Sequence, residues 1–368
     1  MKIIALKERE KNEIRCAITP ETAKLFVNNG HDVYLEPNIG IQSNFLDLEY
    51  AANGAIIVKD IKDAISKANI ILKVRPSPMN SELNELQFAA KNTAIIGMIS
   101  KYRDVNYIKQ AVNNDITLIS MELLPRISKV QNMDVLSSQS NLSGYRAVIE
   151  GSYHYNGSIP MMMTSAGRIN ATKILIIGAG VAGLQAIATA KRLGAIVSAY
   201  DIRKETEEQV ESLGATFLSP EKNHQEINTP GTIINSKNLD ANDQSIQENF
   251  LSSIIENFNI VITTVQIAGK RAPLIINNNI IDKMKPGSVI IDTACDYGGN
   301  VESSDIENII IKNSVKIIGC SDLANKTHFD SSRLYAKNLF NFLNYAIKEN
   351  TINMQDDMIS SMHLENIE

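Results

Sequence analysis

The sequence predicts an α/β protein with two doubly wound domains, each built on a parallel sheet, joined by long connector helices. Three observations support this fold class. Short apolar segments alternate with amphipathic segments along the chain, as in parallel sheets covered by helices. Residues 173–203 carry a strand, a glycine-rich turn, a helix and a second strand in direct succession. The length of 368 residues suffices for two domains of ordinary size.

Composition and charge are those of an ordinary soluble globular protein. Hydrophobic residues make up 44% and charged residues 21% of the chain, and the net charge is −5. This charge argues against nucleic acid or an anionic membrane surface as the main partner. Cys16, Cys295 and Cys320 have no metal-ligand spacing, so they are expected to be reduced cytosolic thiols and no metal site is predicted.

No segment of the sequence is expected to insert into a membrane. The longest uncharged run, residues 174–190, has 17 residues, contains three glycines and is short for a membrane span. The first ten residues, MKIIALKERE, carry charges where a signal peptide requires an apolar core.

The first domain is predicted to comprise residues 1–138 together with residues 325–368. A helix over residues 20–29 is predicted from Thr19 as N-cap and proline at the first helical position. A helix from residue 134 to about residue 155 is interpreted as a connector, and one over residues 332–348 is expected to return to this domain. The expected strands are residues 3–6, 33–35, 55–58, 70–74, 93–98 and 117–120.

The second domain, predicted over residues 139–324, carries a Rossmann-like nucleotide motif. Residues 174–177 form an apolar strand, and residues 178–183 read GAGVAG, which matches G-x-G-x-x-G. A helix follows and ends at Gly194, and a second strand over residues 195–200 leads to Asp201. Further strands are expected at residues 215–218, 259–264, 288–292 and 315–319.

Each glycine of this motif has its own physical role in binding a dinucleotide. Gly178 permits the tight turn, Gly180 lets the backbone approach a pyrophosphate, and Gly183 lets the helix pack closely on the strand. The diphosphate is expected at the helix N-terminus, where backbone N–H groups attract anions. Because the whole strand, turn, helix and strand frame is present, we favour dinucleotide binding over a purely structural turn.

Asp201 predicts a preference for NAD(H). It lies 18 residues past Gly183, where its carboxylate can accept hydrogen bonds from the adenosine ribose hydroxyls. The same carboxylate would repel the 2′-phosphate of NADP(H). Arg203 could weaken this preference, although a solvated surface arginine is the simpler interpretation.

A second set of candidate residues lies in the polar segment over residues 126–140. Gln131 has an amide that can hold a carboxamide in both donor and acceptor directions. Arg126, Asp134 and Ser137 could fix that amide and the nicotinamide ribose. The alternative is a helix-capping segment with Asp134 or Ser137 as the cap, and the residues alone do not decide between the two.

Two further groups of polar residues have both a functional and a structural interpretation. Asp292 and Asp296 end a strand and could face a nicotinamide, or they could simply form a turn with the following glycines. A group of cations could clamp a carboxylate at the strand ends, but ordinary surface charge is the favoured interpretation. These cations are Lys7, Arg9, Arg15, Lys73 and Arg75.

With these residues identified, the chain resembles the alpha subunit of proton-translocating NAD(P) transhydrogenase, specifically its soluble NAD(H)-binding component. Alanine dehydrogenase belongs to the same family and shares the architecture. The resemblance extends over almost the full length, and residues 124–148 are its most specific part. It rests on KEREKNEIRCAITPET at residues 7–22, LPRISKVQNMDVLSSQSNLSGYRAV at 124–148, the nucleotide motif at 173–203 and MKPGSVIIDTACDYGGN at 284–300.

The resemblance implies a homodimeric subunit that binds NAD(H) between its domains. It implies a partner component that carries NADP(H), membrane subunits that translocate protons, and direct hydride transfer between nicotinamides. The expected location is cytoplasmic, at the inner face of the plasma membrane through those partners. Arg126, Gln131, Asp134 and Ser137 match positions that orient the dihydronicotinamide. Besides Gly178, Gly180, Gly183 and Asp201, the implied nucleotide contacts are Ile127, Ser128, Lys129, Leu136, Ser138, Val181, Ala182, Ile202, Arg203, Gly231, Thr264 and Gln266.

The polar segment over residues 219–248 matches a mobile loop that folds over the nucleotide in that family. Two departures from the family pattern occur. Residues 231–233 read Gly-Thr-Ile where the family carries Gly-Tyr-Ala, which puts a tyrosine contact in doubt. Residues 268–270 read Ala-Gly-Lys in place of Pro-Gly-Lys.

Two other functions are compatible with a nucleotide motif, an alanine-dehydrogenase-like oxidoreductase and a non-catalytic NAD(H)-sensing module. Oxidation of an amino acid requires proton transfer by a placed acid or base, typically histidine. In alanine dehydrogenase this histidine follows a strand of the first domain. The matching stretch here, residues 94–100, reads AIIGMIS and contains none. Hydride transfer between nicotinamides needs alignment and exclusion of water, and so the sequence favours a transhydrogenase.

Overall fold

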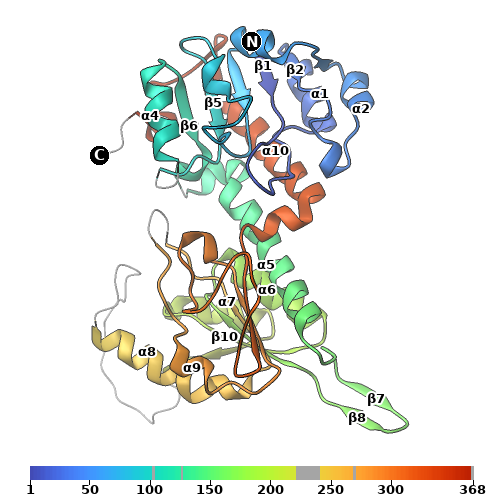
Figure 1. The fold of residues 1–368 in the computed structure, drawn as a ribbon, viewed down its shortest axis with the longest axis vertical. Helices are drawn as coiled ribbons and strands as arrows, with labels where there is room; N and C mark the ends of the chain where they lie inside the picture. Colours follow the sequence, from blue (N-terminus) through green and yellow to red (C-terminus); the bar gives the residue numbers. More distant parts are fainter. Residues whose placement is uncertain (102–103, 126, 221–240, 268–270, 366–368) are drawn as a thin grey trace. The chain divides into compact units, whose positions relative to one another are not determined.

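The computed structural model describes residues 1–101, 104–125, 127–220, 241–267 and 271–365. The chain divides into two compact units (Figure 1). Unit 1 comprises residues 1–139 and 327–368, and unit 2 comprises residues 140–326. Both are parallel-sheet α/β units, which confirms the predicted fold class.

Unit 1 is built on a six-stranded parallel sheet with the order β3-β2-β1-β4-β5-β6. The first strand therefore lies in the middle, where Ile3 pairs with Val33 on one side and with Ile70 on the other. The strands are β1 (Lys2–Ala5), β2 (Asp32–Leu35), β3 (Ile56–Ile57), β4 (Ile70–Leu72), β5 (Ala94–Gly97) and β6 (Thr117–Ser120).

Helices cover both faces of this sheet over two separate apolar cores. Helix α10 packs with α1 on one face through the buried side chains of Tyr335, Leu339 and Phe342. Thr19 caps α1 by accepting a hydrogen bond from the Thr22 backbone, and Pro20 occupies the first turn, as predicted. The helices of unit 1 are α1 (Pro20–Asn28), α2 (Asp47–Ala52), α3 (Ile61–Ser66), α4 (Val105–Asn113), α10 (His328–Ala346) and α11 (Asp357–Ser361), and the short strands β16 (Ile347–Lys348) and β17 (Thr351–Ile352) lie between the last two.

Unit 2 repeats this arrangement and adds one edge strand. Its sheet has the order β11-β10-β9-β12-β13-β15-β14, in which only β14 runs antiparallel. Helix α6 packs on β9 and β10. The strands are β9 (Lys173–Ile177), β10 (Ile196–Tyr200), β11 (Thr216–Leu218), β12 (Ile260–Thr263), β13 (Val289–Asp292), β14 (Ile310–Lys312) and β15 (Val315–Gly319), and the helices are α6 (Val181–Arg192), α7 (Glu207–Ser212), α8 (Ala241–Ile254) and α9 (Asn278–Ile281).

Three features connect or extend the units. Helix α5 (Val135–His154) has 20 residues and runs from unit 1 into unit 2, at the position predicted for a connector. A hairpin of β7 (Met162–Thr164) and β8 (Gly167–Ile169), which the sequence did not predict, projects from the sheet of unit 2 (Figure 1). Among the described residues, no helix combines the length and the apolar character needed to span a bilayer.

Candidate nucleotide-binding site

The turn after β9 requires glycine at two positions for steric reasons. Gly178 has a φ of +99°, and a Cβ there would lie 2.8 Å from Thr264 Oγ1. Gly183 lies in the first turn of α6, and a Cβ there would lie 1.8 Å from the Gly178 carbonyl oxygen. These two glycines allow α6 to start directly against the end of β9, as their positions in the motif predicted.

Thr264 completes this turn from the neighbouring strand. Its backbone N–H donates to the Ile177 carbonyl oxygen at 2.8 Å, and its hydroxyl donates to the Gly178 carbonyl oxygen at 2.9 Å. The Gly178 N–H donates in turn to the Tyr200 carbonyl oxygen at 2.8 Å. The strand ends on both sides of β9 therefore hold the turn in one conformation.

Gly180 is different, because space rather than backbone strain distinguishes it. It has an ordinary φ of −80° and is the N-cap of α6, and no described atom lies within 4 Å of the position a Cβ would occupy. The first backbone N–H groups of a helix have no partner within the helix and attract anions. An open surface at the start of a 12-residue helix fits a diphosphate group.

Asp201 follows β10 and lies beside this turn, but its carboxylate is already fully engaged. Oδ2 accepts from the Ala179 backbone N–H at 2.7 Å and from Arg203 Nη2 at 2.9 Å. Oδ1 accepts from the Arg203 backbone N–H at 2.8 Å and from Arg203 Nε at 3.0 Å. The interpretation of Arg203 as a solvated surface residue is therefore wrong, because this guanidinium forms a bidentate ion pair with Asp201.

The other candidate residues of unit 2 lie around the same turn. Val181 and Ala182 begin α6, and Val181 is exposed. Ile202 packs against an apolar core of the sheet. Gln266 is exposed, and its side-chain amide donates to the Thr293 carbonyl oxygen at 3.3 Å. Gly231 lies outside the described residues, as does most of the segment 219–248.

The candidate segment of unit 1 is a 3-10 helix, η4 (Ser128–Met133), that leads into α5. Val130 and Met133 are buried in the core of unit 1 and anchor the segment. Between them Gln131 is exposed, and no other described residue hydrogen-bonds to its amide. Ile127, Ser128 and Lys129 are also exposed, whereas Arg126 lies outside the described residues.

Asp134 and Ser137 cap helix α5, as the structural alternative predicted. Asp134 Oδ1 accepts from the Ser137 backbone N–H at 2.9 Å, and the Ser137 hydroxyl donates to Asp134 Oδ2. Leu136 packs against the core of unit 1, and the Ser138 hydroxyl donates to Asn338 Oδ1 at 2.7 Å. The capping role does not exclude contact with a ligand, because Asp134, Ser137 and Ser138 all remain partly exposed.

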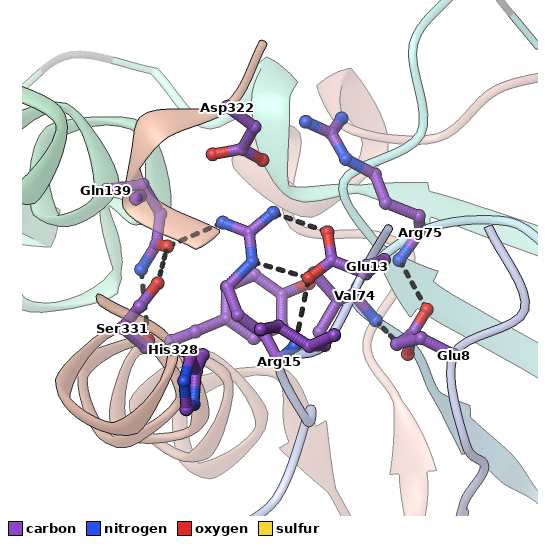
Figure 2. Close-up of polar contacts among 12 residues, drawn as sticks. Glu8, Glu13, Arg15, Val74, Arg75, Gln139, Asp322, His328 and Ser331 are labelled. Atoms are coloured by element: carbon purple, nitrogen blue, oxygen red, sulfur yellow. Dashed lines mark hydrogen bonds and ion pairs between the residues drawn. The ribbon is translucent and has the colours of Figure 1, made fainter. Parts of the chain in front are cut away.

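Arg15 contradicts the expectation of ordinary surface charge. Its side chain is fully buried and forms a bidentate ion pair with Glu13, through Nε at 2.8 Å and Nη2 at 2.6 Å (Figure 2). Its Nη1 donates to Gln139 Oε1 at 2.7 Å. Gln139 also accepts from the Ser331 hydroxyl at the start of α10. The cation is part of the interior of unit 1.

Lys73 and Arg75, immediately after β4, are also buried, and so the surface interpretation is wrong for them as well. Lys73 Nζ lies 3.4 Å from Glu8 Oε2, and the Glu8 carboxylate accepts from the Val74 and Arg75 backbone N–H groups at 2.8 and 3.0 Å (Figure 2). Complete burial raises the pKa of Glu8 to about 7, and the nearby Lys73 ammonium opposes this rise.

The last two cations of this group are closer to the surface. Arg9 Nη2 lies 2.7 Å from Glu36 Oε1, and Lys7 Nζ lies 3.8 Å from the same oxygen. The Arg9 side chain is largely covered, whereas the Lys7 side chain is 43% exposed, and so Lys7 alone fits the expectation.

Asp292 has the structural role of its two interpretations. It is fully buried and accepts five hydrogen bonds, among them those from the Asn300 backbone N–H at 2.9 Å and the Ser304 hydroxyl at 2.7 Å. Asn300, which the sequence patterns did not indicate, is buried as well and bonds both ways with the Val265 backbone. The sequence signal for it was the pair of glycines that precedes it. Asp296 is exposed.

Comparison with known proteins agrees with this architecture. Residues 4–143 match the model of the alanine dehydrogenase/PNT N-terminal domain, and residues 147–365 match that of the C-terminal domain. The chain is 51% identical over 362 residues to the first of the polypeptides that make up the NAD(P) transhydrogenase alpha subunit of Rickettsia prowazekii, and the match covers 98% of this chain and 94% of the relative. The chain belongs to the NAD(P) transhydrogenase alpha subunit family.

Two further members of this family resemble the chain over nearly its full length. The corresponding alpha-subunit polypeptide of the NAD(P) transhydrogenase of Rhodospirillum rubrum is 39% identical over 366 residues, covering 98% of this chain and 95% of the relative. The crystal structure of transhydrogenase from Sinorhizobium meliloti is 38% identical, has a TM-score of 0.88 and covers 99% of this chain and 98% of that one. The transhydrogenase family and its fold therefore apply to both units of the chain.

Proposed function

We propose that this chain is the NAD(H)-binding component of a proton-translocating transhydrogenase. It passes hydride directly between NAD(H) bound here and NADP(H) bound on a partner component, and membrane subunits couple this transfer to proton translocation. The chain would then act at the cytoplasmic face of the plasma membrane through those partners. The observation that carries the proposal is the turn from Gly178 to Gly183 with Asp201 beside it.

In this proposal the residues of unit 2 hold most of the nucleotide. The backbone N–H groups that follow Gly180 bind the diphosphate, and Asp201 accepts the hydroxyls of the adenosine ribose. The open space around Gly180 supports the first assignment. The remaining proposed contacts of unit 2 are Val181, Ala182, Ile202, Arg203, Gly231, Thr264 and Gln266.

The residues of unit 1 are proposed to orient the reactive end of the nucleotide. Gln131 holds the carboxamide of the dihydronicotinamide, with Arg126, Asp134 and Ser137 fixing its position. Two observations support this role: Gln131 is exposed between two buried anchors, and the bond between Asp134 and Ser137 fixes the segment beside it. The neighbouring proposed contacts are Ile127, Ser128, Lys129, Leu136 and Ser138.

The chemistry asked of these residues is alignment. The nicotinamide supplies the hydride, and no proton is gained or lost at the reacting carbon. The chain therefore needs no general acid or base, and it has to hold one ring at the correct distance and angle while water is excluded. The stretch after β5, Met98, Ile99 and Ser100, has no histidine, which disfavours an alanine-dehydrogenase-like reaction.

A homodimer is also included in the proposal, and the β7–β8 hairpin supports it. Met163 is 71% exposed on this hairpin, and Met161, Met162 and Ile169 are exposed beside it. Apolar side chains gathered on a projecting hairpin are typical of protein–protein contacts. A second copy of the chain is the proposed partner, and a monomeric mass by light scattering would remove the dimer from the proposal.

The proposed function is tested by reconstitution. The purified chain is mixed with a transhydrogenase NADP(H)-binding component, and reduction of an NAD analogue by NADPH is followed. We expect steady transfer that requires both proteins, and negligible turnover of alanine or pyruvate with the chain alone. Steady oxidation of alanine, or NADH binding without any transfer, would contradict the proposal.

A further inference from the structure

The Asp201 carboxylate has no hydrogen-bonding capacity left for a ribose. A carboxylate has about four lone-pair sites, two on each oxygen. Four donors fill them, namely the Ala179 N–H and three N–H groups of Arg203. The Asp201 side chain is only 6% exposed beneath this cover. A ribose hydroxyl can be accepted only if one of these donors leaves.

The donors differ in their freedom to leave. The N–H groups of Ala179 and of Arg203 itself belong to the backbone, in the glycine-rich turn and directly after β10. The guanidinium is the end of a flexible side chain that is 39% exposed. Its bond to Asp201 keeps it protonated, because the pair raises the pKa of Arg203. The Arg203 side chain is therefore the displaceable group.

We propose that Arg203 is a specificity-determining residue that competes with the adenosine ribose for Asp201 and so limits the preference for NAD(H) over NADP(H). This inference rests on the proposed function, since it requires NAD(H) at the turn after β9. It adds to that function a residue that weakens the binding of the nucleotide the site prefers.

The physical effect has the same direction for both nucleotides. Binding of NAD(H) exchanges the bidentate ion pair for bonds to neutral hydroxyls, and this exchange lowers the affinity for NAD(H). Binding of NADP(H) brings a 2′-phosphate next to Asp201, where the displaced guanidinium can pair with it. Arg203 therefore opposes the discrimination that Asp201 provides.

The test is a titration of the full-length chain with NADH and with NADPH, followed by nucleotide fluorescence at fixed salt. In Arg203→Met we expect NADH to bind about threefold more tightly or better, and NADPH more weakly. Arg192→Met removes the same charge at the other end of α6, where the side chain is exposed, and should leave both affinities within about twofold of wild type. Arg203→Lys, which keeps the charge but loses the fork, should fall between wild type and Arg203→Met.

A double-mutant cycle separates competition for Asp201 from a general effect of charge. In an Asp201→Ser background there is no carboxylate to compete for, so Arg203→Met should no longer tighten NADH binding. The inference is overturned if Arg203→Met leaves NADH affinity unchanged or weakens it, or if the tightening persists without Asp201. These results would leave the proposed function standing, whereas a wild-type chain that binds no NADH would overturn both.

Discussion

The two units place very different residues at the same point of the same kind of sheet. In each, the first strand lies in the middle of the order and the chain leaves its carboxyl end at the switch point, where ligands of open α/β sheets bind. In unit 2 the residues after β9 are Gly178, Ala179 and Gly180, which leave room for a ligand. In unit 1 the residues after β1 include Glu8, whose side chain turns into the interior.

Unit 1 fills its switch point with its own charges. Glu8 is bound by Lys73 and two backbone N–H groups, and nearby Glu13 holds Arg15. These groups bond to one another instead of to a nucleotide. The comparison shows that strand order creates the position for a site, and that the residues after the first strand decide whether a dinucleotide can use it. It leads to four predictions, given from the largest expected effect to the smallest.

Arg15→Met tests whether the charges of unit 1 are integral to its interior. The substitution leaves Glu13 buried without its partner, and we expect the free energy of unfolding to fall by about 3–5 kcal/mol in urea denaturation. Adding Glu13→Gln should restore a large share of this loss, because the buried charge is then gone. Lys91→Met breaks an exposed ion pair with Asp115 and serves as the control, with an unchanged urea midpoint. Equal midpoints for Arg15→Met and Lys91→Met would refute the comparison.

Glu8 predicts a dependence of stability on pH. The folded chain holds the Glu8 proton up to a pKa of about 7, whereas the unfolded chain releases it near 4.5. Between these values the folded state binds more protons, so the free energy of unfolding falls as pH rises, by on the order of 3 kcal/mol.

Glu8→Gln removes this titration and isolates it from other groups. The difference in unfolding free energy between wild type and Glu8→Gln should shift steadily against wild type as the pH rises from the unfolded pKa to the folded pKa of Glu8. The prediction fails if denaturation curves across this range show a constant difference.

Two glycines of unit 2 separate a steric requirement of the fold from a requirement of the ligand. Gly183→Ala places a Cβ 1.8 Å from a backbone oxygen and should destabilise the chain by about 1–3 kcal/mol or more. Gly180→Ala meets no described atom within 4 Å, so it should fold with nearly the wild-type melting temperature. Its methyl group lies where the diphosphate is proposed, so NADH affinity should fall at least tenfold, about 1.4 kcal/mol. Normal NADH binding by Gly180→Ala would argue against this turn as the site.

Gln131→Asn tests the segment that unit 1 contributes. Most NADH affinity is expected from unit 2, so affinity should stay within a few-fold of wild type. The reconstituted transfer rate should fall at least tenfold, about 1.4 kcal/mol of barrier, because a misplacement of about 1 Å can cost roughly a hundredfold in rate. A lower melting temperature with a normal transfer rate would reduce η4 to a structural element.

Local patterns in the sequence were sufficient for much of this protein. The apolar strands, the Thr19 cap, the connector helix and the G-x-G-x-x-G turn all depend on residues within a few positions of one another. Backbone geometry over such short distances follows from residue type, and so the fold class and the nucleotide turn could be predicted. The two interpretations of Asp134 could not be separated in this way, because a helix cap and a ligand contact require the same kind of side chain.

The tertiary structure alone decided which charges are buried and with which partners. Arg15 meets Gln139, 124 residues away, and Lys73 reaches back across the sheet to Glu8. Asp201 is held by Ala179 from the other side of α6, which leaves Arg203 as its movable donor. A charged residue in a sequence is compatible with both the surface and the interior, because its energy depends on the partners and the water around it. Those surroundings exist only once distant strands have come together.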